Sequence, residues 1–215
     1  MTNVEKTYLP AAGHDWMLPL YDPVVKLLGG DRLRKTLIDQ AALQPTDRVL
    51  DIGCGTGTLA MMIKKLHPSV EIVGLDPDPK ALARALRKAR QARVVIQFDE
   101  GFSDNMPYPD ASFDRVFSSF MFHHLPADAR GKTLREVRRV LKSGGSLHMV
   151  DFAGPDSHGD SSFPRMIHSS ERLKDNADDR VLSLCQQAGF LQATNVMRDA
   201  MLFGKMKVNY FRASV

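Results

Sequence analysis

Cysteine is scarce in this sequence, and long apolar runs are absent. Two cysteines among 215 residues cannot build a disulfide framework, which points to a reducing compartment such as the cytosol. No stretch approaches the about 18 consecutive apolar residues that a membrane-spanning helix needs. Residues 1–13 lack a basic segment followed by an apolar run, so we expect no secretory signal. These absences favour a cytoplasmic protein without a membrane span.

The motifs of metal and nucleoside-triphosphate sites are missing as well. The histidines and cysteines show neither C-x-x-C nor H-x-x-x-H spacing, so we expect no metal site. No G-x-x-x-x-G-K-[S/T] segment occurs, which argues against an NTPase. Hydrophobic residues make up 43% and charged residues 25%, which is the composition of an ordinary globular domain.

The positive charge is mild overall but gathers in two segments. The formal net charge of +4 does not by itself indicate a nucleic-acid partner. Basic residues cluster at positions 80–93 and 130–142, in both cases with apolar residues at helical spacing. We interpret these segments as the solvent-facing sides of amphipathic helices and expect no nucleic-acid partner. A grip on RNA by the two helices is the alternative.

Short apolar segments alternate with helical segments along the middle of the chain. The expected strands cover residues 48–51, 72–76, 94–96, 113–118 and 146–152. The expected helices between them cover residues 58–66, 79–92 and 126–141. This alternation implies parallel pairing, with helices on both faces of the sheet and right-handed crossovers. We therefore predict an α/β fold with a doubly wound, mostly parallel sheet.

The two ends of the chain should complete a single domain around a core at residues 44–152. Residues 1–43 are predicted to form a helical lid, in which Asp22-Pro23 begins one helix and Asp31 caps a second. Residues 153–175 have little periodicity and form a predicted insertion or cap. In the remaining 176–215 we expect a helix and two strands, paired antiparallel at the sheet edge, for seven strands in all.

A glycine-rich turn follows the first predicted strand, in the sequence Asp51-Ile52-Gly53-Cys54-Gly55-Thr56-Gly57. Glycines without a Cβ let the backbone approach a ligand, and the N–H groups of the next helix favour a carboxylate. Asp51 could accept from an ammonium group. Asp76 ends the second strand, where an acid can accept the two hydroxyls of a ribose.

The spacing of the glycines narrows the class of nucleoside ligand. The pattern is G-x-G-x-G, whereas dinucleotide folds use G-x-G-x-x-G. The third glycine is therefore out of place for packing a helix over a pyrophosphate, which argues against a nicotinamide or flavin cofactor. A tight turn without any ligand is the competing interpretation, and the two acids Asp51 and Asp76 weigh against it.

With these residues the chain resembles the class I S-adenosylmethionine-dependent methyltransferases, and among them the ubiquinone and menaquinone biosynthesis C-methyltransferases. The similarity covers roughly residues 43–152. It rests on four segments: residues 49–57, Gly74-Leu75-Asp76, the stretch 106–114 leading to His123-His124-Leu125, and residues 135–145. The resemblance implies that S-adenosylmethionine is the cofactor and that the fold is Rossmann-like.

The resemblance also implies where the parts of the cofactor lie. It places the methionyl part at the glycine turn, formed by Asp51, Gly53, Cys54, Gly55 and Gly57. It places the ribose at Asp76, the adenine beside Pro77, and the sulfonium near Ser118. In the same way, Trp16 or Tyr21 of the N-terminal lid would wall the site.

One triplet departs from the family pattern. The family often has Gly-Asp-Ala where this chain reads Gly101-Phe102-Ser103, and the acid of that triplet bonds the adenine amino group. Phe102 cannot accept a hydrogen bond, although it could stack on adenine. We expect Phe102 and Ser103 to border the adenine, with a nearby acid as a possible substitute acceptor: Asp99, Glu100 or Asp104.

Methyl transfer is an in-line displacement, so the protein mainly has to align the acceptor and exclude water. A base is needed only where the acceptor must lose a proton. His123 and His124, just after the fourth strand, and Asp151, at the end of the fifth, are the candidates. The competing interpretation is structural, with histidines that cap a helix and a strand-end acid that is hydrogen bonded. We expect His148, inside a strand, to be a core residue.

The acceptor is only coarsely indicated by the sequence. Methyltransferases that act on exocyclic nitrogens often carry an Asn-Pro-Pro-Tyr-like loop after the fourth strand, where this chain reads Ser118-Ser119-Phe120-Met121. This favours O- or C-methylation of a small, partly apolar molecule, or a small nitrogen or thiol acceptor. An RNA or protein methyltransferase, and a non-catalytic protein that binds S-adenosylmethionine, are the alternatives.

Overall fold

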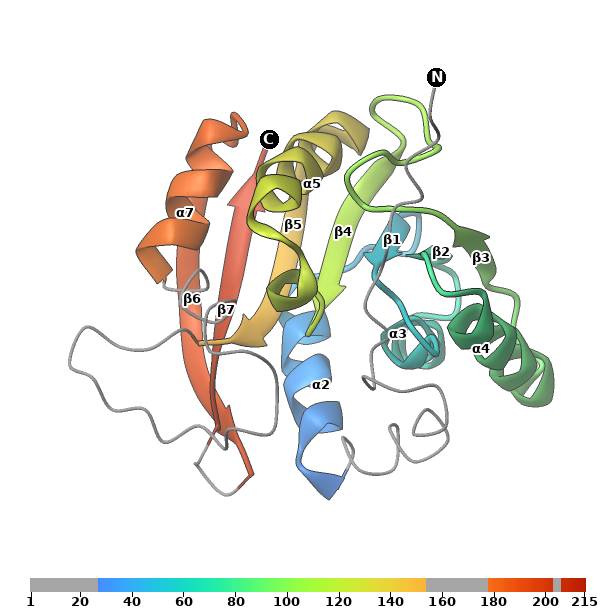
Figure 1. The fold of residues 1–215 in the computed structure, drawn as a ribbon. Coiled ribbons are helices and arrows are strands. Elements are labelled where there is room, and N and C mark those ends of the chain that lie inside the picture. The colour runs from blue at the N-terminus through green and yellow to red at the C-terminus, as the bar shows by residue number, and fades with distance from the viewer. Residues whose placement is uncertain (1–26, 154–177, 203–205) are drawn as a thin grey trace, which may run out of the picture.

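The computed structural model describes residues 27–153, 178–202 and 206–215. These residues form one seven-stranded sheet in the order β3-β2-β1-β4-β5-β7-β6 (Figure 1). The strands are β1 (Arg48–Ile52), β2 (Glu71–Asp76), β3 (Gln97–Glu100), β4 (Phe113–Ser119), β5 (Leu141–Phe152), β6 (Gln192–Met201) and β7 (Met206–Ser214). A search of these residues for a helix long and apolar enough to cross a membrane finds none.

The strand directions confirm the predicted doubly wound α/β fold. Strands β1 to β5 are mutually parallel. Strand β7 runs antiparallel to β5 on one side and to β6 on the other, so the reversed strand lies one place inside the sheet edge. The chain moves outward from β1 to β3, then returns to β4 on the other side of β1. This reversal of strand order makes the carboxyl ends of β1 and β4 the switch point of the sheet, which is where open α/β sheets bind their ligands.

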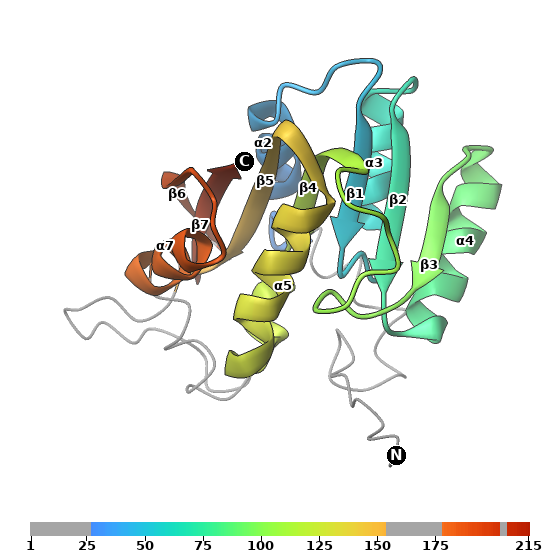
Figure 2. The ribbon, with the colours of Figure 1, turned by 90° about the horizontal axis from the view of Figure 1, so that it is seen from above.

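Helices cover both faces of the sheet (Figures 1 and 2). They are α2 (Gly30–Gln40), α3 (Thr58–Leu66), α4 (Pro79–Ala92), α5 (Ala127–Val140) and α7 (Asp178–Gln187). Helices α5 and α7 pack with the side chains of one face, whereas α2 and α3 pack with those of the other, and α4 lies against β2 and β3. Alternate residues of β1 enter the two cores, with Leu50 in one and Val49 in the other.

Two sequence predictions about local structure were wrong. The third strand begins at Gln97, three residues later than the expected 94–96, and Val95 is 87% exposed. The α4 helix ends in a left-handed residue, Arg93, and the apolar triplet after it belongs to the turn that leads to the strand. Asp31 does not cap α2, because the helix already begins at Gly30 and the cap residue is Gly29, with φ of 92°.

The N-terminal region is described only from residue 27 onward. Within it, α2 buries Leu33 and Leu37 completely and packs against β5 and α3, as a helix of the core layer does. The rest of the predicted lid, including Trp16, Tyr21 and Asp22-Pro23, lies outside the described residues. The predicted insertion likewise lies outside them beyond residue 153.

Candidate functional site

The carboxyl ends of four neighbouring parallel strands carry buried polar side chains. Asp51 lies near the end of β1, Asp76 ends β2, Ser118 lies near the end of β4 and Asp151 near the end of β5. None of them is more than 9% exposed. The strand register places these ends at one edge of the sheet, since Ile52 pairs with both Leu75 and Ser118. The sequence predicted these four residues for one site, and the fold brings them to one edge.

The three glycines of the turn have positive φ angles, but they serve different purposes. A Cβ on Gly53 would lie 2.1 Å from Cγ of Met121, and one on Gly57 would lie 2.9 Å from Cβ of Ala85. A Cβ on Gly55 would meet no atom within 4 Å. Gly53 and Gly57 are therefore required by packing within the protein, whereas Gly55 alone of the three borders open space.

Hydrogen bonds fix the turn between β1 and α3. The backbone N–H groups of Gly53 and Cys54 both donate to the carbonyl of Leu75, at 2.7 and 3.1 Å. The N–H of Gly55 donates to Oδ2 of Asp76 at 2.8 Å. These contacts tie the turn to the end of β2, so the two acids predicted for the cofactor belong to one connected structure.

Asp51 holds a carboxylate oxygen that needs a partner. The residue is 1% exposed, and its Oδ2 has no hydrogen-bond partner among the residues that the structure describes. Burial raises the pKa of this carboxyl to about 7, against the opposing effect of the Arg34 guanidinium. An unsatisfied buried acceptor is costly, and a ligand ammonium group would satisfy it.

Asp76 organises the turn that follows β1. Its two oxygens accept from the N–H groups of Gly55 and Asp78, at 2.8 and 2.9 Å. Burial raises the pKa of Asp76 to about 6, although both amides act in the opposite direction. Each carboxylate oxygen can accept more than one hydrogen bond, so ribose hydroxyls can still be bound.

Asp78 is a further site candidate, to which no sequence motif pointed. Its Oδ1 accepts from the N–H of Lys80 and caps α4, as expected for this position. Its Oδ2 is buried, and no partner for it occurs in the described part of the chain. The hydroxyl of Ser118 is likewise buried and has no hydrogen-bond partner among the described residues. Buried polar atoms without a partner among the described residues thus occur near the ends of both β2 and β4.

The residues predicted to border the adenine make contacts within the protein. Ser103 Oγ lies 3.0 Å from Oγ1 of Thr133 on α5. Phe102 is half-buried in a short bridge with Asn105. Asp99, a proposed substitute acceptor, accepts from the Tyr108 hydroxyl at 2.9 Å. Recognition of adenine by Phe102, Ser103 and the half-buried Pro77 therefore stays a prediction.

His123 and Asp151, predicted as separate candidates, form a pair. His123 belongs to a short 3-10 helix, η2 (Phe122–His124), that directly follows β4. Its Nδ1 lies 2.6 Å from Oδ1 of Asp151, and its backbone N–H donates to Oδ2 at 3.0 Å. Both side chains are buried. The ring of His124 packs against that of His123, with centroids 4.1 Å apart.

The chain reaches η2 through a strained residue. Phe120 has φ of 56°, which is uncommon for a residue other than glycine. Its N–H donates to the carbonyl of Val150, and its ring packs on Phe152 with centroids 5.1 Å apart. The next residue, Met121, covers Gly53. No sequence motif pointed to Met121, apart from its place in the loop after the fourth strand.

His148 is a structural residue. His148 is 1% exposed, and its Nε2 lies 2.9 Å from Oγ of Ser146. Burial lowers its pKa to about 3, so it is a neutral core residue, as predicted. Within residues 27–153, 178–202 and 206–215, no three His, Cys, Asp or Glu side chains are arranged to hold a metal ion.

Comparisons with known proteins agree on one family. A family model described as a methyltransferase domain matches residues 49–145. The demethylmenaquinone methyltransferase of Deinococcus radiodurans is 40% identical over 142 residues, which are 65% of this chain and 58% of that protein. The 27-O-demethylrifamycin SV methyltransferase of Amycolatopsis mediterranei is 37% identical over 125 residues, 56% of this chain and 44% of that protein. The chain thus spans less than two thirds of the length of these relatives.

A solved structure shares the fold. The YcgJ protein of Bacillus subtilis superposes with a TM-score of 0.71 at 20% identity, over 84% of this chain and 96% of that one. The matched family model includes the glycine turn, Asp76 and His123, but it ends before Asp151. The family match therefore includes the ends of β1, β2 and β4 but not the end of β5.

Proposed function

Since the chain belongs to the class I S-adenosylmethionine-dependent methyltransferases, we propose that it transfers a methyl group from S-adenosylmethionine to a small, partly apolar acceptor. The observation that carries this proposal is the buried, unpaired Oδ2 of Asp51, beside a glycine turn whose Gly55 borders open space. The two relatives described above are named as methyltransferases of demethylmenaquinone and of 27-O-demethylrifamycin SV, and both names describe small molecules. Methylation of an oxygen or a carbon atom fits these two relatives best.

The residues present fit the cofactor. Asp51 would accept from its ammonium group, and the N–H groups at the start of α3, which has no side-chain cap, would bind its carboxylate. Asp76 would accept the ribose hydroxyls, and the unpaired Ser118 hydroxyl would lie toward the sulfonium. When bound, S-adenosylmethionine supplies an activated methyl group. The protein contributes alignment, which alone can lower a barrier by about 7–11 kcal/mol.

His123 is the proposed base for an acceptor that must lose a proton. Asp151 holds Nδ1 of its ring, so the tautomer we infer carries the proton there and offers Nε2 as the acceptor. Asp151 also accepts from the N–H of Phe152 at 2.7 Å and therefore acts as a positioning residue. His124 packs on the base and would restrict the tilt of its ring.

RNA methylation is supported less well than a small acceptor. Arg139 of α5 forms ion pairs with Glu136 and Asp110, and Lys142 pairs with Asp114. Much of the charge of the second basic segment is therefore neutralised by acidic residues of the protein itself.

We also propose that the protein is cytoplasmic, because both cysteines are buried free thiols.

The test has a binding arm and a transfer arm. Isothermal titration with S-adenosylmethionine should show one site, and Asp76→Ala should abolish it. Incubation of the enzyme with methyl-labelled cofactor and a cell extract should label a small molecule, which mass spectrometry then identifies. Absence of cofactor binding would remove the proposal. Binding without transfer to any component would favour the non-catalytic alternative, and label in RNA or protein would redirect the assignment of the acceptor.

A further inference from the structure

Positive charge is concentrated on the outer side of α4. The helix and the residue that ends it contain six basic residues and no Asp or Glu: Lys80, Arg84, Arg87, Lys88, Arg90 and Arg93. The side that packs against the sheet holds four buried residues: Ala81, Leu82, Ala85 and Ala89. On the opposite side, Arg87 and Arg90 are exposed. Since α4 lies beside the edge strand β3, this charge lies at one edge of the sheet (Figures 1 and 2).

Four of these arginines form neither an ion pair nor a side-chain hydrogen bond in the described part of the chain: Arg84, Arg87, Arg90 and Arg93. The helix dipole stabilises cations in the last turn, which accounts for Arg90 but not for Arg84 and Arg87. Like charges three or four residues apart destabilise a helix, and Arg84, Arg87 and Arg90 have this spacing. A negatively charged partner on this surface would turn that cost into an attraction.

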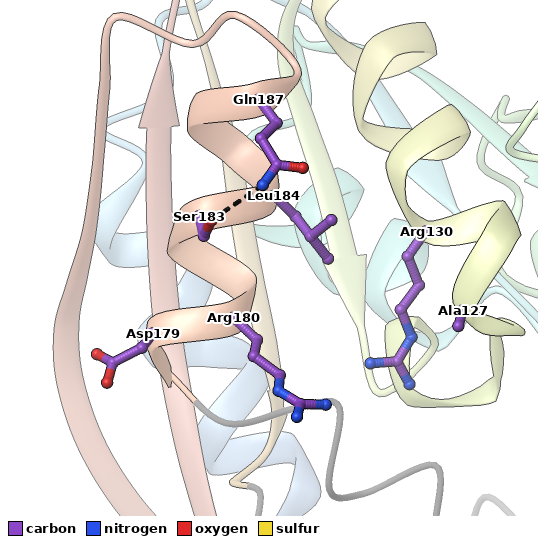
Figure 3. Close-up of a pocket in the computed structure, with 7 residues that line it drawn as sticks. All are labelled: Ala127, Arg130, Asp179, Arg180, Ser183, Leu184 and Gln187. Atoms are coloured by element: carbon purple, nitrogen blue, oxygen red, sulfur yellow. Dashed lines mark hydrogen bonds between the residues drawn. The ribbon is translucent and has the colours of Figure 1, made fainter.

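The second basic segment, on α5, differs in this respect. Arg139 and Lys142 form ion pairs with acidic residues, and Nε of Arg138 donates to the carbonyl of Gly189 at 2.7 Å. Arg130 is 1% exposed and lines the groove between α5 and α7 (Figure 3). Of the two basic segments, α4 is therefore the one whose charge is available to a partner.

Exposed aliphatic side chains accompany the arginines of α4. Leu86 is 39% exposed and lies one turn before Arg90, and Val95 is 87% exposed in the turn after the helix. Neither belongs to the two hydrophobic cores. The large apolar side chains that the described residues expose are all leucines and valines. Single-stranded nucleic acids are bound with aromatic side chains that stack on bases, whereas aliphatic side chains beside basic ones suit the boundary between lipid headgroups and acyl chains.

We propose that the outer side of α4, together with Leu86 and Val95, docks on the surface of a bilayer that contains anionic lipids. The unpaired arginines contact lipid phosphates, and the two aliphatic side chains enter the boundary of the acyl chains. The contact is mainly electrostatic, so it is reversible and depends on salt. This inference goes beyond the proposed function and holds whether or not the protein transfers a methyl group.

The experiment measures co-sedimentation of the full chain with phosphatidylcholine vesicles, prepared with or without roughly 30% phosphatidylglycerol. The protein should bind only the vesicles that contain phosphatidylglycerol, and raising the salt from about 0.1 M to about 1 M should release it, because the Debye length falls from about 10 Å to about 3 Å. The double variant Arg87→Gln, Arg90→Gln should weaken binding about 30-fold, from about fivefold for each arginine near an anionic surface. Val95→Ser should weaken it about fivefold through lost apolar contact.

The matched control is the double variant Lys132→Gln, Arg135→Gln, which removes two exposed positive charges from α5 and should bind vesicles as the unmodified protein does. Equal loss in both double variants would show that only net charge matters, and would overturn the docking surface, as would absence of binding to anionic vesicles. Tighter binding to a single-stranded RNA than to vesicles, lost in Arg87→Gln, Arg90→Gln, would overturn it in favour of RNA.

Titration of S-adenosylhomocysteine into Arg87→Gln, Arg90→Gln should give the affinity of the unmodified protein, because both side chains are exposed and lie outside the proposed cofactor site. This result would show that the variant is folded, so its loss of vesicle binding would reflect the surface alone. If neither protein binds S-adenosylhomocysteine but the vesicle results are as expected, the proposed function fails and the docking surface stands.

Discussion

Lowering the pH from about 7.5 to about 5 should weaken the binding of S-adenosylhomocysteine by nearly two orders of magnitude. Its ammonium group needs an ionised partner, and burial raises the pKa of Asp51 to about 7. At about pH 5 only about 1% of such a carboxyl is ionised, so the apparent dissociation constant rises roughly 100-fold. This corresponds to about 2.7 kcal/mol, from two pH units at 1.36 kcal/mol each.

The direction of the pH effect on affinity follows from the ionisation of Asp51. The cationic ligand favours the ionised carboxylate, so binding lowers the pKa of Asp51 and releases a proton near neutral pH. Asp76, with its pKa raised to about 6, adds to the loss of affinity at the acid end. At alkaline pH the amine of the ligand itself loses its proton, and affinity should fall again, since an uncharged amine no longer pairs with the carboxylate. The expected profile is therefore a bell with its maximum between these limits.

Isothermal titration at several pH values, in pairs of buffers with different ionisation enthalpies, measures both the affinity and the protons released. Asp51→Asn is the decisive variant, because it keeps the shape of the side chain but cannot ionise. It should bind more weakly at about pH 7.5, with little dependence on pH above about 6. A flat affinity profile for the unmodified protein between about pH 5 and 7, or the same slope in Asp51→Asn, would refute the assigned role of this carboxyl.

The remaining predictions concern packing, catalysis and stability. Gly53→Ala should abolish cofactor binding in the same titration, because the new Cβ clashes with Met121. The double variant with Met121→Ala should regain part of the affinity, although the φ of 64° still disfavours alanine at this position. If the double variant regains no affinity, this clash is not the cause of the loss. His123→Gln should lower kcat by about 10²–10⁴ for a proton-bearing acceptor while leaving the Kd of the cofactor unchanged, and an unchanged kcat at saturating acceptor would exclude His123 as the base. Without ligand, Asp51 favours the folded state in its protonated form, so this stability is complete below about pH 3.8 and is lost as the pH rises through about 7. Asp51→Asn should therefore raise the melting temperature more at about pH 8 than at about pH 5, and calorimetry that shows equal shifts at both would contradict the raised pKa.

Local signals made the glycine turn and the elements beside it predictable from the sequence. Helix α3 runs over 58–66 as expected, because Gly57 begins it and His67-Pro68 follows it. The acids Asp51 and Asp76 were predicted correctly to lie at the carboxyl ends of their strands. Strand ends and glycine turns are determined by residues that are close in the sequence. Strand β3 was misplaced because it is a short strand at the sheet edge with mostly polar residues, while the apolar triplet before it attracted the prediction.

Sequence patterns could not predict contacts between segments that are distant in the chain. The pair of His123 and Asp151 joins residues 28 positions apart, and each was recognised only as a separate candidate. The contact of Met121 with Gly53 depends on the left-handed backbone at Phe120, which nothing in the local sequence indicates. Such features arise from tertiary packing, which can override the local preferences of a residue.

The contact between Gly53 and Met121 constrains how this family can diverge. The glycine turn after β1 and the loop after β4 touch there, so a larger residue at one position requires a smaller residue at the other. A lineage that changes the loop after β4 therefore carries the change into the glycine turn, where we propose that the methionyl end of the cofactor binds. In an alignment of close homologues, positions 53 and 121 should covary in side-chain volume, and new acceptor preferences should arise by paired substitutions at these two positions.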